Sequence, residues 1–125
     1  MRKVLAAAAL AGSIAVTGLA VAPAAQAASS GGWGTFYAAN HKAYTHGSTY
    51  RSHGKVYTHW YGKEATPKFG YVWFRYYANG SWHQFSRKWD GSHDETWSGR
   101  GIKKIYTWTC WGGSSTYCGD RHRVF

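Results

Sequence analysis

Polar and apolar side chains alternate along much of the chain beyond residue 42, and this period of two is the pattern of a β-strand. The run 55–61 shows it most clearly. Its two faces are Val56, Thr58 and Trp60 on one side and Tyr57, His59 and Tyr61 on the other. Both faces carry aromatic rings, so we expect a strand with rings on each side of its sheet.

Turn signals separate the strand-like runs. Asn79-Gly80 lies between the runs 71–78 and 81–89, and an Asn-Gly pair in that position is the strongest short-range signal for a β-hairpin. Further along, the chain contains a turn at 90–91, a short strand at 96–98, a strand at 102–111, a turn at 112–115 and a returning segment at 117–125. Five to seven short strands joined by turns predict an all-β fold, a small antiparallel sandwich or barrel.

The first 27 residues have the organisation of a secretory signal peptide. Arg2 and Lys3 are basic, the stretch 4–22 is apolar, and Ala25-Gln26-Ala27 is an A-x-A cleavage site. An uncleaved membrane anchor is the alternative, and the small residues within the stretch argue against it. We therefore expect residues 1–27 to be removed, leaving a secreted, extracellular protein with no membrane span.

The remaining chain divides into two parts by composition. Residues 28–42 are rich in Ser, Gly and Ala with three isolated rings, which predicts a flexible arm. Residues 43–125 form the aromatic-rich β domain. One small domain of this size excludes a two-domain enzyme.

Composition changes the picture of the core. The eight Trp, ten Tyr and five Phe all follow the leader, and the leader holds every Leu and the single Met. The aliphatic side chains larger than Ala in the mature domain are Val56, Val72, Ile102, Ile105 and Val124. The core must therefore be built from rings, and an all-helical fold is excluded because straight-chain apolar residues that line helix faces are missing.

The two cysteines, Cys110 and Cys118, are predicted to form a disulfide, because export delivers the chain to an oxidising compartment. A two-cysteine metal site would need further ligands from elsewhere in the chain. The seven histidines show no compact ligand spacing. We predict no metal site and no cofactor.

Groups for catalysis are scarce. Only five carboxylates are present, no facing pair is indicated, and no nucleophile or phosphate-binding motif occurs. We predict no catalytic residues. The leading enzymatic alternative is a small secreted ribonuclease, with Glu64 as base, His83 as acid and Arg75 holding phosphate.

Basic side chains and rings interleave through the domain. The formal net charge is +10, and it becomes about +8 without Arg2 and Lys3 of the leader. Because so small a domain cannot bury all of its rings, some must be exposed, and exposed Trp and Tyr anchor protein interfaces and stack on sugars. The residues predicted to bind a partner are Trp33, Phe36, Tyr37, Trp82, Trp97 and Trp111.

Two classes of partner fit these features. The first is an extracellular protein held by the N-terminal arm, and the second is an anionic cell-wall polymer or glycan. Export argues against nucleic acid, although rings between basic residues also suit that ligand.

The layout of leader, Gly- and Ser-containing arm, aromatic β domain and late cysteine pair resembles the small secreted β-proteins of actinobacteria. Among them it is similar in layout to the adaptor subunits of umbrella toxin particles, in which a compact domain with an extended N-terminal arm joins a lectin-bearing subunit to a toxin scaffold. The resemblance implies a structural, non-catalytic role, with residues 29–42 as the insertion arm. We therefore expect a secreted binding or adaptor protein of an extracellular antibacterial toxin assembly. The alternatives are a free-standing envelope-glycan-binding or antimicrobial protein and the ribonuclease.

Overall fold

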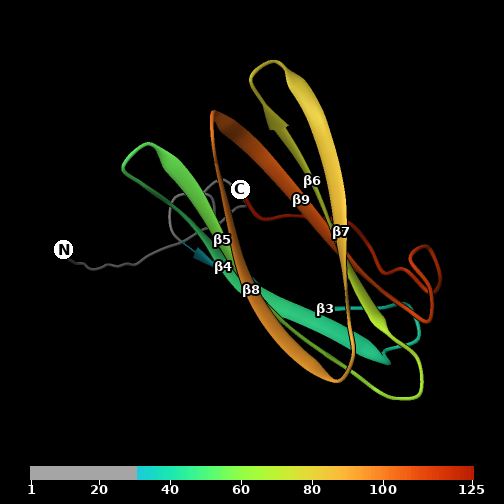
Figure 1. Cartoon of the computed structure of the whole chain (residues 1–125). Coiled ribbons are helices and arrows are strands. Elements are labelled where there is room, and N and C mark those ends of the chain that lie inside the picture. Colours follow the sequence, from blue (N-terminus) through green and yellow to red (C-terminus); the bar gives the residue numbers. More distant parts are fainter. Residues whose placement is uncertain (1–30) are drawn as a thin grey trace.

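The computed structural model describes residues 31–125, and Figure 1 shows these as two layers of β-strands. Within this range there is no helix. The predicted leader, 1–27, and residues 28–30 of the predicted arm lie outside the described residues.

Within residues 31–125, nine strands form two antiparallel sheets. In chain order the strands are β2 (Gly31–Gly32), β3 (Phe36–Tyr37), β4 (Ala43–Ser52), β5 (Lys55–Glu64), β6 (Gly70–Ala78), β7 (Ser81–Trp89), β8 (Ser92–Arg100), β9 (Ile102–Trp111) and β10 (His122–Arg123). We call the five-stranded sheet, which has the order β2-β4-β5-β8 with β3 also paired to β4, sheet B, and the four-stranded sheet, which has the order β10-β9-β6-β7, sheet C. The predicted all-β sandwich is confirmed, and its main strands, nine or ten residues long, exceed the short strands expected.

Tight turns join consecutive strands, either within one sheet or from one sheet to the other. The predicted hairpin joins β6 to β7, with positive φ at both Asn79 (53°) and Gly80 (84°), as a type I′ turn requires. The predicted turn at Asp90-Gly91 is also present, but it carries the chain from β7 in sheet C to β8 in sheet B. Gly101 returns it to β9 in sheet C. Consecutive strands at this side of the sandwich therefore lie in opposite layers (Figure 1).

Aromatic rings fill the space between the layers. Trp60 and Phe74, one from each sheet, are fully buried with ring centroids 6.5 Å apart. The ring centroids of Trp89 and Trp60 lie 5.5 Å apart. The predicted division of β5 into two faces is confirmed, and the face that carries Val56, Thr58 and Trp60 is the buried one.

Threonines replace the missing aliphatic residues elsewhere in the core. The hydroxyls of Thr45 and Thr109 lie 2.9 Å apart and link the two sheets. Thr109 also donates a hydrogen bond to the backbone carbonyl of Phe36 at 3.0 Å. Thr49 and Thr58 form a second buried hydroxyl pair at 3.3 Å. These bonds satisfy polar groups that would otherwise be costly to bury.

The described part of the predicted arm, residues 31–42, is packed against sheet B, which differs from the flexible segment expected there. Trp33 donates a hydrogen bond from Nε1 to Thr49 Oγ1 at 3.0 Å. Phe36 stacks on His122 with centroids 3.9 Å apart. The rings therefore give the segment the apolar contacts that its Gly- and Ala-rich composition lacks.

The predicted disulfide between Cys110 and Cys118 is confirmed. It ties the loop 112–121 to the end of β9. The Trp73 indole donates a hydrogen bond to the Ser114 carbonyl at 2.6 Å, so the loop is also held over β6. This loop forms a raised border on the outer face of sheet C.

Candidate functional site

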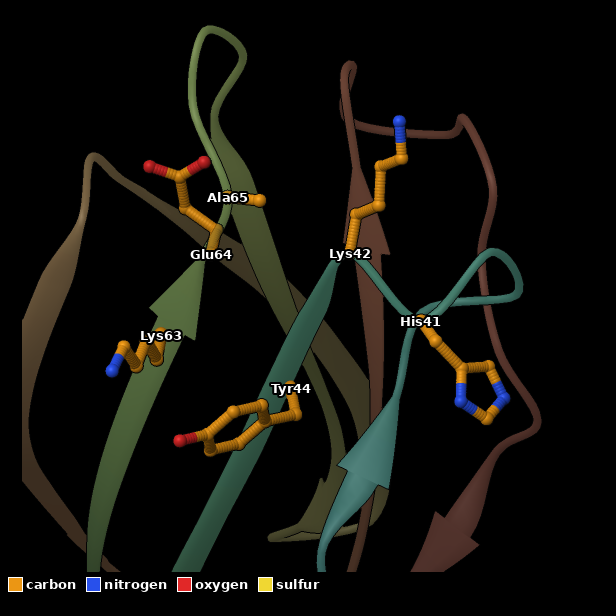
Figure 2. Close-up of a pocket in the computed structure, with 6 residues that line it drawn as sticks. All are labelled: His41, Lys42, Tyr44, Lys63, Glu64 and Ala65. Atoms are coloured by element: carbon orange, nitrogen blue, oxygen red, sulfur yellow. The ribbon is translucent and has the colours of Figure 1, made fainter.

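One hollow, of about 280 Å³, lies where β4 begins and β5 ends. It is lined by His41, Lys42, Tyr44, Lys63, Glu64 and Ala65. Figure 2 shows that these side chains diverge: Lys42 and Lys63 point away from each other, and His41 points away from Glu64. The buried Glu64 carboxylate accepts a hydrogen bond from the Gly91 N–H, so it holds the turn between the sheets. This arrangement is structural and presents no convergent reactive groups.

The three residues of the ribonuclease alternative are not brought together. Arg75 pairs with Gln84 in register and faces out of sheet C. His83 is opposite Tyr76, on the other face of the same sheet, and its ring stacks on Tyr76 at 5.0 Å. Glu64 holds a turn at the end of sheet B. No single ligand pose brings all three to one phosphate.

The outer face of sheet B is lined by Tyr and His. Tyr50 stacks on Tyr57 with ring centroids 5.4 Å apart, and the ring centroids of His46 and Tyr61 lie 4.9 Å apart. The His59 ring forms a 2.6 Å hydrogen bond with the Thr96 hydroxyl. Among residues 31–125 no three His, Cys, Asp or Glu side chains gather as metal ligands would.

The outer face of sheet C has a different chemistry. The register of β6 with β9 places Trp73 beside Trp108 and Arg75 beside Tyr106. The register of β6 with β7 places Tyr77 beside Trp82. Antiparallel partners point to the same face, so all of these side chains project outward together. We call the following set the Arg–Trp face: Trp73, Arg75, Trp82, Tyr106, Trp108 and Arg121.

Guanidinium groups and rings are layered on this face. The Arg121 guanidinium lies 4.1 Å from the Trp108 ring centroid, and that of Arg75 lies 4.8 Å from Trp82. Trp73 and Trp108 stack almost parallel, with centroids 5.9 Å apart. Each cation–π contact contributes about 0.5–1 kcal/mol at an exposed position and holds its guanidinium in one place.

Two hollows mark the Arg–Trp face, and Arg121 borders both. The first, of about 320 Å³, is lined by Arg75, Trp82, Tyr106 and Arg121. The second, of about 300 Å³, is lined by Trp73, Gln84, Trp108, Ser114, Ser115, Cys118, Gly119 and Arg121. The disulfide-bound loop thus supplies one wall, and the two hollows adjoin at Arg121.

Charge is distributed unequally between the sheets. The strands of sheet C contain no Asp or Glu, whereas those of sheet B contain Glu64, Asp94 and Glu95. Sheet C carries the following basic residues in its strands: Arg75, Arg87, Lys88, Lys103, Lys104 and Arg123. Arg87 is neutralised across the sheets by Glu95 at 2.9 Å. The Arg–Trp face is therefore a basic surface without carboxylates among its strands.

The six residues predicted to bind a partner are distributed over the molecule. Trp82, 40% exposed, lies on the Arg–Trp face, and Tyr37, 44% exposed, lies at the edge of sheet B. Trp97 packs edge-on against Phe85 at 5.1 Å. The buried Trp111 donates from Nε1 to the Ala65 carbonyl at 2.9 Å. Trp33 and Phe36, as described above, pack against the core.

Sequence reasoning missed four residues of the face, Trp73, Tyr106, Trp108 and Arg121, and it named Arg75 only as the phosphate-holding residue of the ribonuclease alternative. The sequence did contain a signal for part of the Arg–Trp face. The predicted hairpin at 79–80 sets Tyr77 opposite Trp82, and Arg75, two residues before Tyr77 on the same strand, points to the same face. Nothing local indicates that β9 lies on the other side of β6.

Comparisons with protein families, with curated proteins and with solved structures find no match for this chain. Within residues 31–125 there is also no helix of the length and apolarity needed to cross a membrane.

Proposed function

We propose that this chain is an exported, non-catalytic binding protein that holds an extracellular partner on its Arg–Trp face. The observation that carries this proposal is the position of Arg121, stacked on Trp108 between two adjoining hollows of a sheet whose strands lack carboxylates. Arg and Trp are the residue types that most often dominate the binding energy of an interface. A basic, ring-lined surface is suited to an acidic partner.

The two outer faces of the sandwich differ in chemistry, because sheet B carries Tyr and His while sheet C carries Trp and Arg. We assign the partner to the sheet C face alone. The resemblance in layout to adaptor subunits of umbrella toxin particles supports a place in an extracellular antibacterial assembly. Since residues 31–42 pack on sheet B, we assign partner binding to the Arg–Trp face in preference to that segment.

Recovery of the tagged protein from culture fluid tests the proposal. Wild type is compared with the double variant Trp82→Ala/Arg121→Gln and with Tyr50→Ala, whose ring is equally exposed on the opposite sheet. We expect wild type and Tyr50→Ala to carry the same bound material and the double variant to lose it. Equal recovery by all three proteins would refute the assignment of the face.

A further inference from the structure

We propose that the ligand of the Arg–Trp face is an acidic polysaccharide, with sugar rings lying on Trp82 and Tyr106 and carboxylates held by Arg75 and Arg121. The inference rests on the proposed function and adds to it the chemical class of the partner. The sugars are of the uronic-acid type, each carrying its acid group on the ring.

The guanidinium groups are available and fixed. Arg75 donates one N–H to Gln84 Oε1 at 3.2 Å, and Arg121 is exposed. Each group is held against a ring, Arg75 on Trp82 and Arg121 on Trp108. Because a guanidinium presents a planar fork of donors, it pairs with a carboxylate through two parallel hydrogen bonds. A group already held in place loses less entropy on binding than a mobile one.

The rings beside these groups form a platform. Trp82 and Tyr106 have centroids 6.1 Å apart, and both line the first hollow together with the two arginines. Tyr77 supports Trp82 with an edge contact at 5.2 Å. Exposed Trp and Tyr combine a flat apolar surface with a polar edge, which suits a sugar with an apolar ring face and polar hydroxyls around it.

The lining of the second hollow favours a hydroxyl-rich ligand. Gln84, Ser114 and Ser115 offer donors and acceptors there, and neither hollow is lined by a Val, Leu, Ile or Met side chain. An apolar protein segment would find no aliphatic contacts in these hollows. Because the hollows adjoin at Arg121, a chain of several sugars can pass from one to the other.

Charge complementarity selects the acidic form of such a chain. Lys104 lies opposite Tyr77, and Arg123 lies opposite Tyr106, so both flank the Arg–Trp face in the register of sheet C. The strands of sheet C contain no carboxylate that would repel the acid groups, and the carboxylate nearest to the face in sequence is the exposed Asp120, next to Arg121. A neutral sugar chain would gain nothing from these charges.

The experiment is isothermal titration calorimetry with a galacturonate hexamer and the mature protein. The matched neutral probe is the same hexamer with its carboxyl groups reduced, and the rival probes are polyglutamate and single-stranded DNA. Variants Trp82→Ala and Arg121→Gln are compared with Tyr50→Ala, which removes an exposed ring, and Lys63→Gln, which removes one charge, both from sheet B. Thermal melts confirm that each variant folds.

We expect the hexamer to bind wild type, with affinity reduced about tenfold or more by each Arg–Trp variant and changed less than about twofold by each control variant. Equal binding of the reduced hexamer would overturn the need for an acid group. Polyglutamate binding as tightly, with no dependence on Trp82, would show an unspecific basic surface and overturn the inference. Tighter, Trp82-dependent binding of DNA would replace the glycan by nucleic acid.

The two proposals fail separately. If the hexamer does not bind but the culture-fluid material is still lost from Trp82→Ala/Arg121→Gln, the face is the binding surface and the acidic-glycan assignment is wrong. If the double variant retains that material, the proposed function itself is wrong.

Discussion

The Trp89 ring is clamped between two glycines, one from each sheet, and substitution of either glycine should destabilise the fold. A Cβ at Gly62 would lie 2.7 Å from Trp89 Cζ2, and one at Gly70 would lie 2.6 Å from Trp89 Cε2. Both distances are far below the normal separation of two non-bonded carbon atoms in contact. The ring is buried and has a glycine on each side, so it cannot move away from an added methyl group.

Overpacking of a well-filled core lowers the free energy of unfolding by about 1–3 kcal/mol. Because Trp89 is confined, we expect the loss in Gly62→Ala to lie near the upper end of this range. For a domain of about 100 residues, a loss of about 3 kcal/mol lowers Tm by at least about 10 °C. The matched control is Gly32→Ala, whose Cβ would meet its nearest neighbour, the Gly47 carbonyl oxygen, at 3.8 Å. That substitution should change stability by less than about 0.5 kcal/mol.

Urea unfolding of Gly62→Ala, Trp89→Phe and the double variant measures the effect. The smaller Phe ring leaves room for the methyl group, so the double variant should be more stable than the two single losses predict, by about 1 kcal/mol. Strictly additive losses, or a Gly62→Ala protein as stable as Gly32→Ala, would show that Trp89 is not clamped between the glycines.

Three other substitutions test separate parts of the fold. Trp33→Ala should lower the free energy of unfolding by about 2–3 kcal/mol in urea, because the ring packs on the core, whereas a free arm would show no change. Thr109→Val should lower the free energy of unfolding by about 1–3 kcal/mol, because it leaves both the Thr45 hydroxyl and the Phe36 carbonyl without this partner. Thr45→Val should lower it less, because Thr109 can still donate to the Phe36 carbonyl. Equal losses of stability in thermal melts would contradict this arrangement of hydrogen bonds. Replacement of Cys110 and Cys118 by Ala should cost about 2.5 kcal/mol by loss of the closed loop, and an unchanged Tm would argue against a stabilising role.

Local signals in the sequence predicted the parts of the fold that depend on local chemistry. Asn79-Gly80 specified its hairpin because both residues tolerate positive φ. The alternation around Trp60 predicted which residues of β5 share a face, and the structure buries the face of Val56, Thr58 and Trp60. The two cysteines paired because the turn between them is short.

The remaining elements depend on contacts between distant parts of the chain. The strand β4 went unrecognised because its inner positions, such as Thr45 and Thr49, are polar and are satisfied only by partners elsewhere in the sequence. The segment 31–42 looked too polar to fold, yet it pairs with that same strand. The Arg–Trp face required knowing that β9 and β7 flank β6, which no local pattern indicates.

The most direct test of the central claim is a titration of ¹⁵N-labelled protein with the galacturonate hexamer, followed through the eight Trp indole N–H signals. Binding on the Arg–Trp face predicts that the signals of Trp73, Trp82 and Trp108 shift with a common Kd, while those of Trp60 and Trp89, which lie in the core between the sheets, do not. Shifts confined to residues of sheet B, with these three indole signals unchanged, would contradict the account.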